Sequence, residues 1–295
     1  MKLADSNEDN IINRVCDTLT SAPSVLVGPG DDCAVVKYNE ESVELLKTDC
    51  VIESVHFHSA ENPKRVGWKA VARVISDIAA MGGTPKHLLV TLMLRKDTEL
   101  SWLDELYAGM QECASAFSAT IVGGETSSLP MGSMNAISIA GTGIAKRQQY
   151  VLRSTAKVGD MIFVTGSLGG SIKGHHLDFT PRLKEAQQLV NHHQISSMMD
   201  LSDGLAKDLP RLCQLSKVGY KIDKNALPCN PNCSTDHALN DGEDYELLFT
   251  VPAEHCAELI KNWPSTLAKT TCIGEICEVN ESHHTSLKGG WDHFS

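Results

Sequence analysis

Apolar runs and amphipathic stretches alternate along the first half of the chain and predict a series of strands and helices. Residues 67–81 and 101–118 repeat apolar side chains at helical spacing, and each stretch predicts an amphipathic helix. Shorter apolar runs predict buried strands at residues 43–52, 87–94, 120–123 and 135–145. This alternation predicts an α/β or α+β fold built from packed layers.

A polar and charged stretch near residues 146–160 interrupts this pattern, which then starts again. Further strands are expected at residues 161–166, 245–251 and 270–276, and helices at residues 182–193, 203–217 and 253–262. A chain of 295 residues is long enough for two medium-sized domains. We therefore expect an N-terminal domain at residues 1–148 and a C-terminal domain at residues 149–295.

Charge and composition argue against two classes of partner. The formal net charge of −11 is opposite in sign to the surface that nucleic-acid binding needs, so no nucleic-acid partner is expected. No apolar stretch approaches the roughly 18 residues of a membrane span, so no membrane partner is expected. The polar, acidic N-terminus is unlike a signal peptide and predicts a cytoplasmic protein. Its ten cysteines are then expected to be reduced thiols, and surface positions are expected for His175/His176, His192/His193 and His283/His284.

Candidate chemistry lies in six carboxylate clusters flanked by Gly or Ser. In chain order they are GPGDDCAVV (28–36), KTDCVIESVHF (47–57), ISDIAAMGG (75–83), VGGETSS (122–128), MDLSDGL (199–205) and NDGEDYELLF (240–249). Carboxylate oxygens are hard ligands that favour Mg²⁺ over zinc, and Mg²⁺ commonly accompanies phosphorylated substrates. The chain contains neither the P-loop pattern GxxxxGKS/T nor a GxGxxG between strand and helix. The clusters therefore predict ATP-dependent phosphate chemistry without a P-loop.

Some of these clusters have a simpler explanation when each is considered alone. Asp31 and Asp32 fit solvated acids in a β-turn. Asp77 shares a polar helical stripe with Lys69 and Arg73, opposite the expected core face. An Arg73–Asp77 pair spaced i,i+4 would contribute only a few tenths of a kcal/mol. The small residues that follow Asp77, AAMGG, instead favour close approach of a ligand or another segment.

A helix start explains part of the motif MDLSDGL. Ser202 fits a helix N-cap and Asp203 fits the first turn, but this leaves Asp200 unexplained. The motif VGGETSS is expected to present Glu125 in a turn after a double glycine. Because so many acidic turns occur on one chain, their convergence on cations is the stronger interpretation.

The order of these motifs resembles one known family over nearly the whole chain. The run GDD, TDCVIESVHF, SDIAAMG, VGGET, RSTAKVGD, MDLSDGL, GEDYELLFTVP and GWDHF resembles bacterial thiamine-monophosphate kinase. The resemblance implies a two-domain fold like that of aminoimidazole ribonucleotide synthetase, with the N-terminal sheet pairing in a homodimer. It also implies the reaction of ATP with thiamine phosphate to give thiamine diphosphate and ADP, by direct Mg²⁺-assisted in-line transfer.

The resemblance also implies roles for individual residues. Several Mg²⁺ ions would be held by Asp32, Thr48, Asp49, Asp77, Glu125, Asp200 and Asp203. ATP would be contacted by Tyr107, Gly124, Glu125, Arg153 and Ser202, and thiamine phosphate by His56, Glu243 and Trp291. The chain departs from the family at two of these motifs. Lys47 stands where the family has Ser or Thr, which predicts that one Mg²⁺ is lost or bound through water, and Glu125 stands where the family has Asp.

The implied chemistry agrees with the composition of the motifs. A phosphate monoester is largely a dianion at neutral pH, so the acceptor needs no general base, and no catalytic base is assigned. Two anionic phosphates do need several cations to bring them together. The cationic thiazolium of thiamine would stack on Trp291 in the tail, GGWDHFS, unless that tail is a frayed terminus.

Two other classes of function are compatible with the motifs. One is another ATP-using synthetase of the same fold, which would act on a ribonucleotide or on selenide. The other is a non-enzymatic protein that binds Mg-nucleotide. ADP formation measured with and without thiamine phosphate distinguishes all three.

Overall fold

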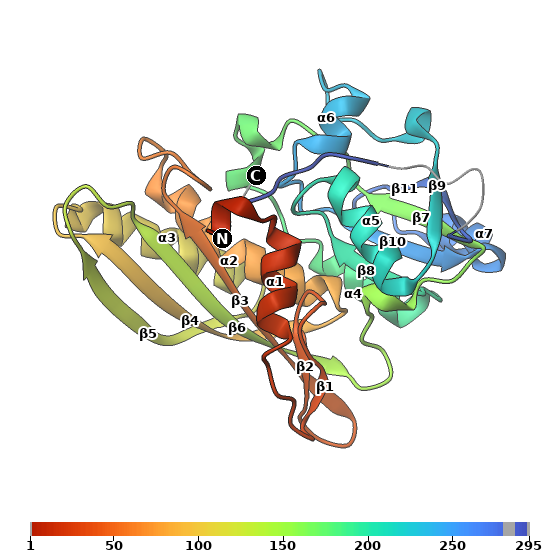
Figure 1. Cartoon of the computed structure of the whole chain (residues 1–295), viewed down its shortest axis with the longest axis horizontal. Helices are drawn as coiled ribbons and strands as arrows, with labels where there is room; N and C mark the ends of the chain where they lie inside the picture. Colours follow the sequence, from red (N-terminus) through yellow and green to blue (C-terminus); the bar gives the residue numbers. More distant parts are fainter. Residues whose placement is uncertain (1, 280–286, 294–295) are drawn as a thin grey trace.

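The computed structural model describes residues 2–279 and 287–293 and contains two β-sheets with helices packed on them (Figure 1). The first sheet has the strand order β1-β2-β3-β6-β4-β5 and the second β8-β10-β7-β11-β9. The first comprises β1 Val25–Val27, β2 Ala34–Lys37, β3 Ser42–Ile52, β4 Thr84–Arg95, β5 Thr120–Leu129 and β6 Ala136–Lys146. The second comprises β7 Asp160–Thr165, β8 Ser197–Asp200, β9 Gly219–Ile222, β10 Leu247–Pro252 and β11 Thr270–Cys277.

The helices of the described chain pack mainly on these sheets. They are α1 Glu8–Cys16, α2 Pro63–Ala80, α3 Leu100–Ala116, α4 Leu183–His192, α5 Leu205–Ser216, α6 Thr235–Asn240 and α7 Cys256–Asn262. Short 3₁₀ turns include η2 Arg153–Thr155 and η4 His175–Leu177. In the part of the chain that the structure describes, no helix combines the length and the apolar character needed to cross a bilayer.

Helices α2 and α3 cover one face of the first sheet. Helix α2 begins at Pro63, and the side chain of Asn62 caps it by accepting a hydrogen bond from Lys64 N at 2.9 Å. The two helices meet at paired glycines. A Cβ on Gly67 would lie 2.0 Å from Leu106 O, and a Cβ on Gly109 would lie 1.8 Å from Lys64 O. These glycines are therefore needed for the close crossing that holds α2 in place.

The opposite face of the first sheet is open in the single chain. Along β3, Val43, Leu45 and Val51 point into the core, whereas Leu46 on the other face is 39% exposed. Leu89 on β4 and Val122 on β5 are likewise exposed. The sheet therefore carries apolar side chains on both faces, although the helices of the described residues cover only one face.

The second sheet is antiparallel and has a core on each face. Successive residues of β10 alternate between these cores, with Leu248 beside α5 and Phe249 beside α4 and α7. The C-terminal end of α2 also reaches this region, because Ala79 and Ala80 pack in the same cluster as Phe249. Helix α2 thus contacts both sheets and joins the two halves of the molecule (Figure 1).

The layered fold expected from the sequence is confirmed, but two local expectations are wrong. The predicted strand at 120–123 is the longer β5, so VGGETSS lies within a strand and not in a turn. Helix α5 begins at Leu205, and its N-cap is Gly204 with φ of 100°, so Ser202 does not cap it. The first sheet uses residues up to Lys146 and the second begins at Asp160. The domain division at residues 148 and 149 stays a prediction.

Candidate active site

Helix α2 carries one polar residue per turn on the side that faces the second half of the molecule. Lys69, Arg73 and Asp77 are spaced i, i+4 and i+8 and therefore share one face. Lys69 is 0% exposed and Asp77 is 6% exposed. The stripe lies opposite the core face, as expected, yet Lys69 and Asp77 are buried, because α2 is covered on both sides. A buried polar stripe needs partners, and these partners build the site.

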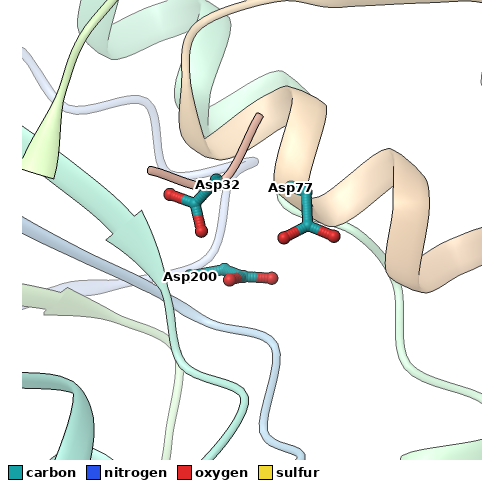
Figure 2. Close-up of side chains that lie close together, drawn as sticks. All are labelled: Asp32, Asp77 and Asp200. Atoms are coloured by element: carbon teal, nitrogen blue, oxygen red, sulfur yellow. The ribbon is translucent and has the colours of Figure 1, made fainter. Parts of the chain in front are cut away.

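Three of the predicted metal ligands meet at one point. Oxygen atoms of Asp32, Asp77 and Asp200 lie within 4.8 Å of one another (Figure 2). Asp32 comes from the loop before β2, Asp77 from α2 and Asp200 from the end of β8, so both halves of the chain contribute. We call these residues the aspartate triad.

Burial makes the aspartate triad a strong candidate for cation binding. Burial and the charge of Asp32 raise the pKa of Asp200 to about 7. Burial also raises the pKa of Asp77 well above its usual range, against the charge of Lys47. Asp32 Oδ2 is buried and accepts no hydrogen bond from any described residue. An unpartnered carboxylate oxygen among neighbouring carboxylates is the arrangement that a hard divalent ion such as Mg²⁺ would stabilise.

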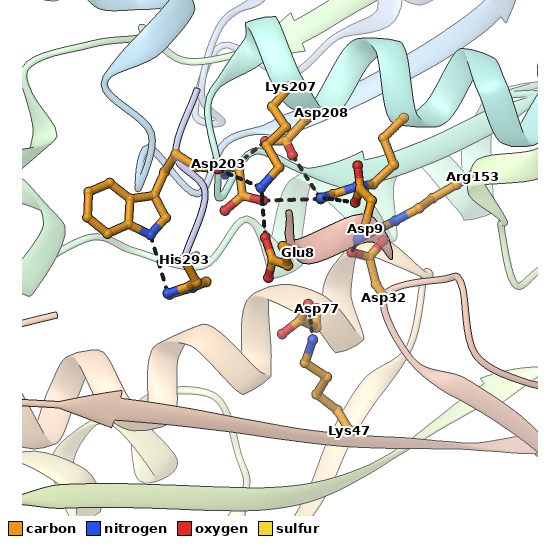
Figure 3. A network of polar contacts seen from close by, with 12 residues as sticks. Glu8, Asp9, Asp32, Lys47, Asp77, Arg153, Asp203, Lys207, Asp208 and His293 are labelled. Atoms are coloured by element: carbon orange, nitrogen blue, oxygen red, sulfur yellow. Dashed lines mark hydrogen bonds and ion pairs between the residues drawn. The ribbon is translucent and has the colours of Figure 1, made fainter. Parts of the chain in front are cut away.

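Two basic side chains contact the aspartate triad. Lys47 Nζ lies 2.9 Å from Asp77 Oδ1, and the guanidinium of Arg153 pairs with Asp32 (Figure 3). Burial alone would lower the pKa of Lys47, but the charges of Asp77 and Asp49 outweigh it and raise that pKa above its usual value. The side chain of Lys47 is therefore a protonated ammonium.

Arg73 pairs with Asp49 and not with Asp77. Its Nε lies 3.0 Å from Asp49 Oδ2, and its Nη1 donates to Cys50 O at 3.0 Å. The alternative i,i+4 pair with Asp77 is therefore wrong. Asp49 lies beside the aspartate triad, and its negative charge contributes to the raised pKa of Asp77.

A pocket next to the aspartate triad brings together the three residues predicted for thiamine phosphate. His56, Glu243 and Trp291 all line it, together with Ser202 and Asp203. Glu243 adopts φ of 54°, which is uncommon for a residue with a side chain and is typical of functional loops.

Lys69 contacts three of the residues that line this pocket, His56, His176 and Glu243. Its Nζ donates to Glu243 Oε2 at 2.6 Å and to His56 O at 2.7 Å, and it lies 2.7 Å from His176 Nδ1. His176 is buried, so its expected surface position is wrong. Neither Lys69 nor His176 was assigned to the site from sequence. The regular spacing of Lys69, Arg73 and Asp77 was the signal available for Lys69.

His56 presents a neutral ring to the pocket. Its Nδ1 accepts a hydrogen bond from Ile52 N at 3.0 Å, which leaves Nε2 as the donor atom of the ring. Burial and the charge of Arg73 lower the pKa of His56 to about 4. The ring therefore stays uncharged near neutral pH.

The C-terminal tail is docked at the pocket as far as His293, so the alternative of a frayed terminus is wrong for residues 287–293. Trp291 N donates to Asp203 O at 2.9 Å, and Trp291 Nε1 donates to His293 Nδ1 at 3.4 Å. Glycine is favoured at position 289, because its φ of 142° is rarely adopted by residues with a side chain. The tail residue Phe294 lies outside the described residues.

Asp203, three residues after Asp200, forms ion pairs with two basic side chains of α5. Its Oδ2 lies 3.1 Å from Lys207 Nζ and 3.2 Å from Arg211 Nη1. Lys207 also contacts Glu8 of α1 at 2.7 Å, so this network fixes α1 beside α5 (Figure 3). A metal ion at Asp203 would share its carboxylate with these side chains.

Four predicted site residues contact neither the aspartate triad nor the pocket within one chain. Thr48 lies on the open face of the first sheet with Leu46, opposite Asp49, and its hydroxyl is 3.5 Å from Ser138 Oγ. Glu125 and Gly124 lie on β5, which β6 and β4 separate from β3, a distance of about 14 Å at usual strand spacing. The remaining residue is Tyr107, which is exposed on α3.

Gly124 has a packing role of its own, since a Cβ there would lie 1.9 Å from Val90 O on β4. The other two residues predicted for ATP lie nearer the triad. Arg153 is in η2 and contacts Asp32, and Ser202 lines the pocket.

Comparison with known proteins agrees with this arrangement. The family AIR synthase related protein matches through its N-terminal domain at residues 30–146 and its C-terminal domain at residues 139–286. Thiamine-monophosphate kinase of Rhodopirellula baltica is 36% identical over 253 residues, covering 80% of this chain and 79% of the relative. That of Aquifex aeolicus is 32% identical, with 100% of both chains covered.

A solved structure, AaThiL complexed with AMPPCP and TMP, matches with a TM-score of 0.86 and 31% identity over 99% of both chains. These matches confirm the resemblance read from the motifs. The chain belongs to the thiamine-monophosphate kinase family of AIR synthase related proteins.

Proposed function

We propose that this chain transfers the γ-phosphoryl group of ATP to thiamine phosphate, giving thiamine diphosphate and ADP. The observation that carries the proposal is the position of the aspartate triad beside a pocket lined by His56, Glu243 and Trp291. A phosphoryl-transfer enzyme needs a cation site next to the place where the acceptor binds. Family membership supports the same reaction.

The triad residues Asp32, Asp77 and Asp200 would hold Mg²⁺. Asp49 and Asp203 are proposed as further ligands, although each is paired with a basic side chain in this structure. Bound Mg²⁺ would neutralise the two phosphate groups and stabilise the charge of an in-line transition state. Arg153, which contacts Asp32, is suited to bind an ATP phosphate, because a guanidinium donates to phosphate oxygens in a fixed geometry.

The pocket residues would bind and orient thiamine phosphate. Glu243 is ionised at neutral pH and complements the positive charge of thiamine. Trp291 offers an aromatic face to the thiazolium, and His56 offers an uncharged Nε2–H donor. No general base is needed, because the acceptor phosphate is already a dianion.

A homodimer is part of the proposal. Thr48, Tyr107, Gly124 and Glu125 would then complete the site of a second copy. The open, partly apolar face of the first sheet, with Leu46, Leu89 and Val122 exposed, supports pairing between two N-terminal sheets. A cytoplasmic location is also proposed, and it is consistent with ten free cysteines.

The direct test measures ADP formation with Mg·ATP in the presence and absence of thiamine phosphate. We expect ADP only when thiamine phosphate is present, together with an equal amount of thiamine diphosphate. Equal ADP formation without thiamine phosphate would indicate another ATP-using reaction. No ADP under either condition would indicate a protein that only binds nucleotide.

A further inference from the structure

Lys47 lies among the carboxylates that would hold Mg²⁺. It is on β3, on the same face as Asp49, which puts its side chain on the helix-covered side of the sheet. Its Nζ lies 2.9 Å from Asp77 Oδ1, and the side chain is 23% exposed. The ammonium therefore sits at the edge of the aspartate triad and is not a freely solvated surface charge (Figure 3).

Three carboxylates around the site each form an ion pair with one basic side chain. The pairs are Asp32 with Arg153, Asp49 with Arg73 and Asp77 with Lys47. Asp200 instead accepts a hydrogen bond from the neutral hydroxyl of Ser76 at 2.5 Å. Buried carboxylates at this spacing need positive charge to remain ionised. On the Asp77 side of the triad, Lys47 supplies that charge from the chain itself.

An ammonium and a divalent ion compete for the same position. Lysine carries a compact point charge with three donors, and its four-carbon stem lets the charge reach a carboxylate from a neighbouring strand. The carboxylate oxygen that it engages is not available as a metal ligand at the same time. Asp32 Oδ2, which accepts no hydrogen bond from a described residue, remains available for a divalent ion.

We propose that Lys47 is a built-in cation that takes the place of one divalent metal ion beside Asp77. The inference rests on the proposed function and defines the metal content of that site. The chain then binds one divalent ion fewer than it would with a neutral oxygen-bearing residue at position 47. The ammonium supplies fixed positive charge that does not depend on the metal concentration.

The test is a count of bound Mn²⁺ per chain, with Mn²⁺ alone and with Mn²⁺ plus a non-hydrolysable ATP analogue, from the electron paramagnetic resonance signal of free Mn²⁺. We expect Lys47→Thr to bind one more Mn²⁺ per chain than the unaltered protein. Lys37→Thr is the matched control, because Lys37 is an exposed lysine on the neighbouring strand β2, and its count should not change.

Thermal melting gives a second readout. In EDTA, Lys47→Thr should melt at a lower temperature than the unaltered protein, because Asp77 loses its ion pair, and Mn²⁺ should raise its melting temperature more. If Lys47→Thr does not fold, Lys47→Gln, which keeps the stem and offers an amide oxygen, replaces it with the same expected gain of one Mn²⁺.

An equal or smaller Mn²⁺ count in the folded variant would overturn the inference, since Lys47 would then move aside for the metal or leave its binding unaffected. The count requires no thiamine phosphate. A failure here is therefore distinguishable from failure of the proposed function, which the assay of ADP formation on the unaltered protein tests.

Discussion

The ammonium of Lys69 lies 2.6 Å from Glu243 Oε2 and links the middle of α2 to the loop before β10. Burial lowers the pKa of Lys69 to about 8, against the charge of Glu243. For Glu243, burial alone would raise the pKa, but the hydrogen bond from His176 and the charge of Lys69 outweigh it and lower the pKa to about 2. Glu243 is thus ionised at neutral pH and held at its uncommon backbone conformation by a buried partner.

Lys69→Met should strongly destabilise the protein, because it leaves the carboxylate of Glu243 without its cation. The expected loss is about 3–5 kcal/mol in the free energy of unfolding, the usual cost of breaking a buried pair. Urea denaturation measures it. Lys64→Met is the control, since Lys64 forms a solvent-exposed pair with Glu112 and should cost less than about 1 kcal/mol. The double variant Lys69→Met/Glu243→Gln should recover part of the loss, and equal instability of single and double variants would contradict the pairing.

Asp77→Asn should lower turnover by at least about 100-fold, because it removes charge from the proposed Mg²⁺ site. The melting temperature in EDTA should change little. The substitution removes the ion pair with Lys47, but it also removes the electrostatic repulsion between the carboxylate of Asp77 and those of Asp32 and Asp200, and the two effects offset each other. The rate of ADP formation and a melting curve measure the two effects. Asp178→Asn is the control, because this exposed residue pairs with Arg65 and should keep full activity. Near-normal turnover of Asp77→Asn would remove Asp77 from the site.

Trp291→Ala should raise KM for thiamine phosphate roughly tenfold, because a lost stacking contribution of about 1.4 kcal/mol is one factor of ten. KM for ATP should barely change, since the indole lines the pocket of His56 and Glu243. Initial-rate measurements with each substrate varied give both constants. Trp291→Phe keeps an aromatic face, and its KM for thiamine phosphate should be close to that of the unaltered protein. An equal effect of Trp291→Ala on both substrates would mean that the tail supports the fold of the whole site.

Glu125 should act in the site of a second copy. Glu125→Asp should be tolerated, and Glu125→Ala should weaken binding of Mg·ATP, which calorimetry measures. At an ATP concentration that supports little activity of either variant alone, mixing Glu125→Ala with Asp77→Asn should restore activity through mixed dimers, up to about a quarter of the normal value if subunits exchange randomly. Each mixed dimer then contains one site with neither change. If subunit exchange is shown and no activity returns, the two residues belong to the same chain's site.

The contribution of Asp244 to the stability of the folded state should decrease as pH rises. Burial raises its pKa from 3.8 to about 7, against the hydrogen bonds from Ser171 and Gly169. Between these values the folded state binds more protons than the unfolded state, so its contribution is full below pH about 4 and is lost as pH rises through about 7. Asp244→Asn should flatten the slope of stability against pH by up to about 1.4 kcal/mol per pH unit in this window.

Urea denaturation at several pH values between about 5 and 8 measures this slope. Other buried carboxyls, such as Asp31, shift in the same direction, so only the difference from the unaltered protein is informative. The exposed carboxyl of Glu254 serves as the control, and Glu254→Gln should leave the slope unchanged. Parallel curves for Asp244→Asn and the unaltered protein would contradict the raised pKa of Asp244.

The sequence by itself determined the longer elements and the composition of the site. Periodicity located β3 and α2 within a few residues, because a core-facing side of a strand or helix must be apolar at a fixed spacing. The acidic motifs also contained every member of the aspartate triad. In contrast, the extent of β5 was missed, since the glycines and polar residues of VGGETSS resemble a turn when their pairing with β4 is unknown.

Tertiary structure alone decided which of these residues meet. Asp32, Asp77 and Asp200 come from separate elements and converge only because α2 is packed between the two halves of the molecule. Tertiary structure also decided which acidic and basic side chains pair. The helical spacing allowed Arg73 to pair with Asp77, yet Arg73 pairs with Asp49 on β3. An i,i+4 ion pair on a helix contributes little, whereas a buried carboxylate without a cation is strongly destabilising. Asp77 is then paired with Lys47.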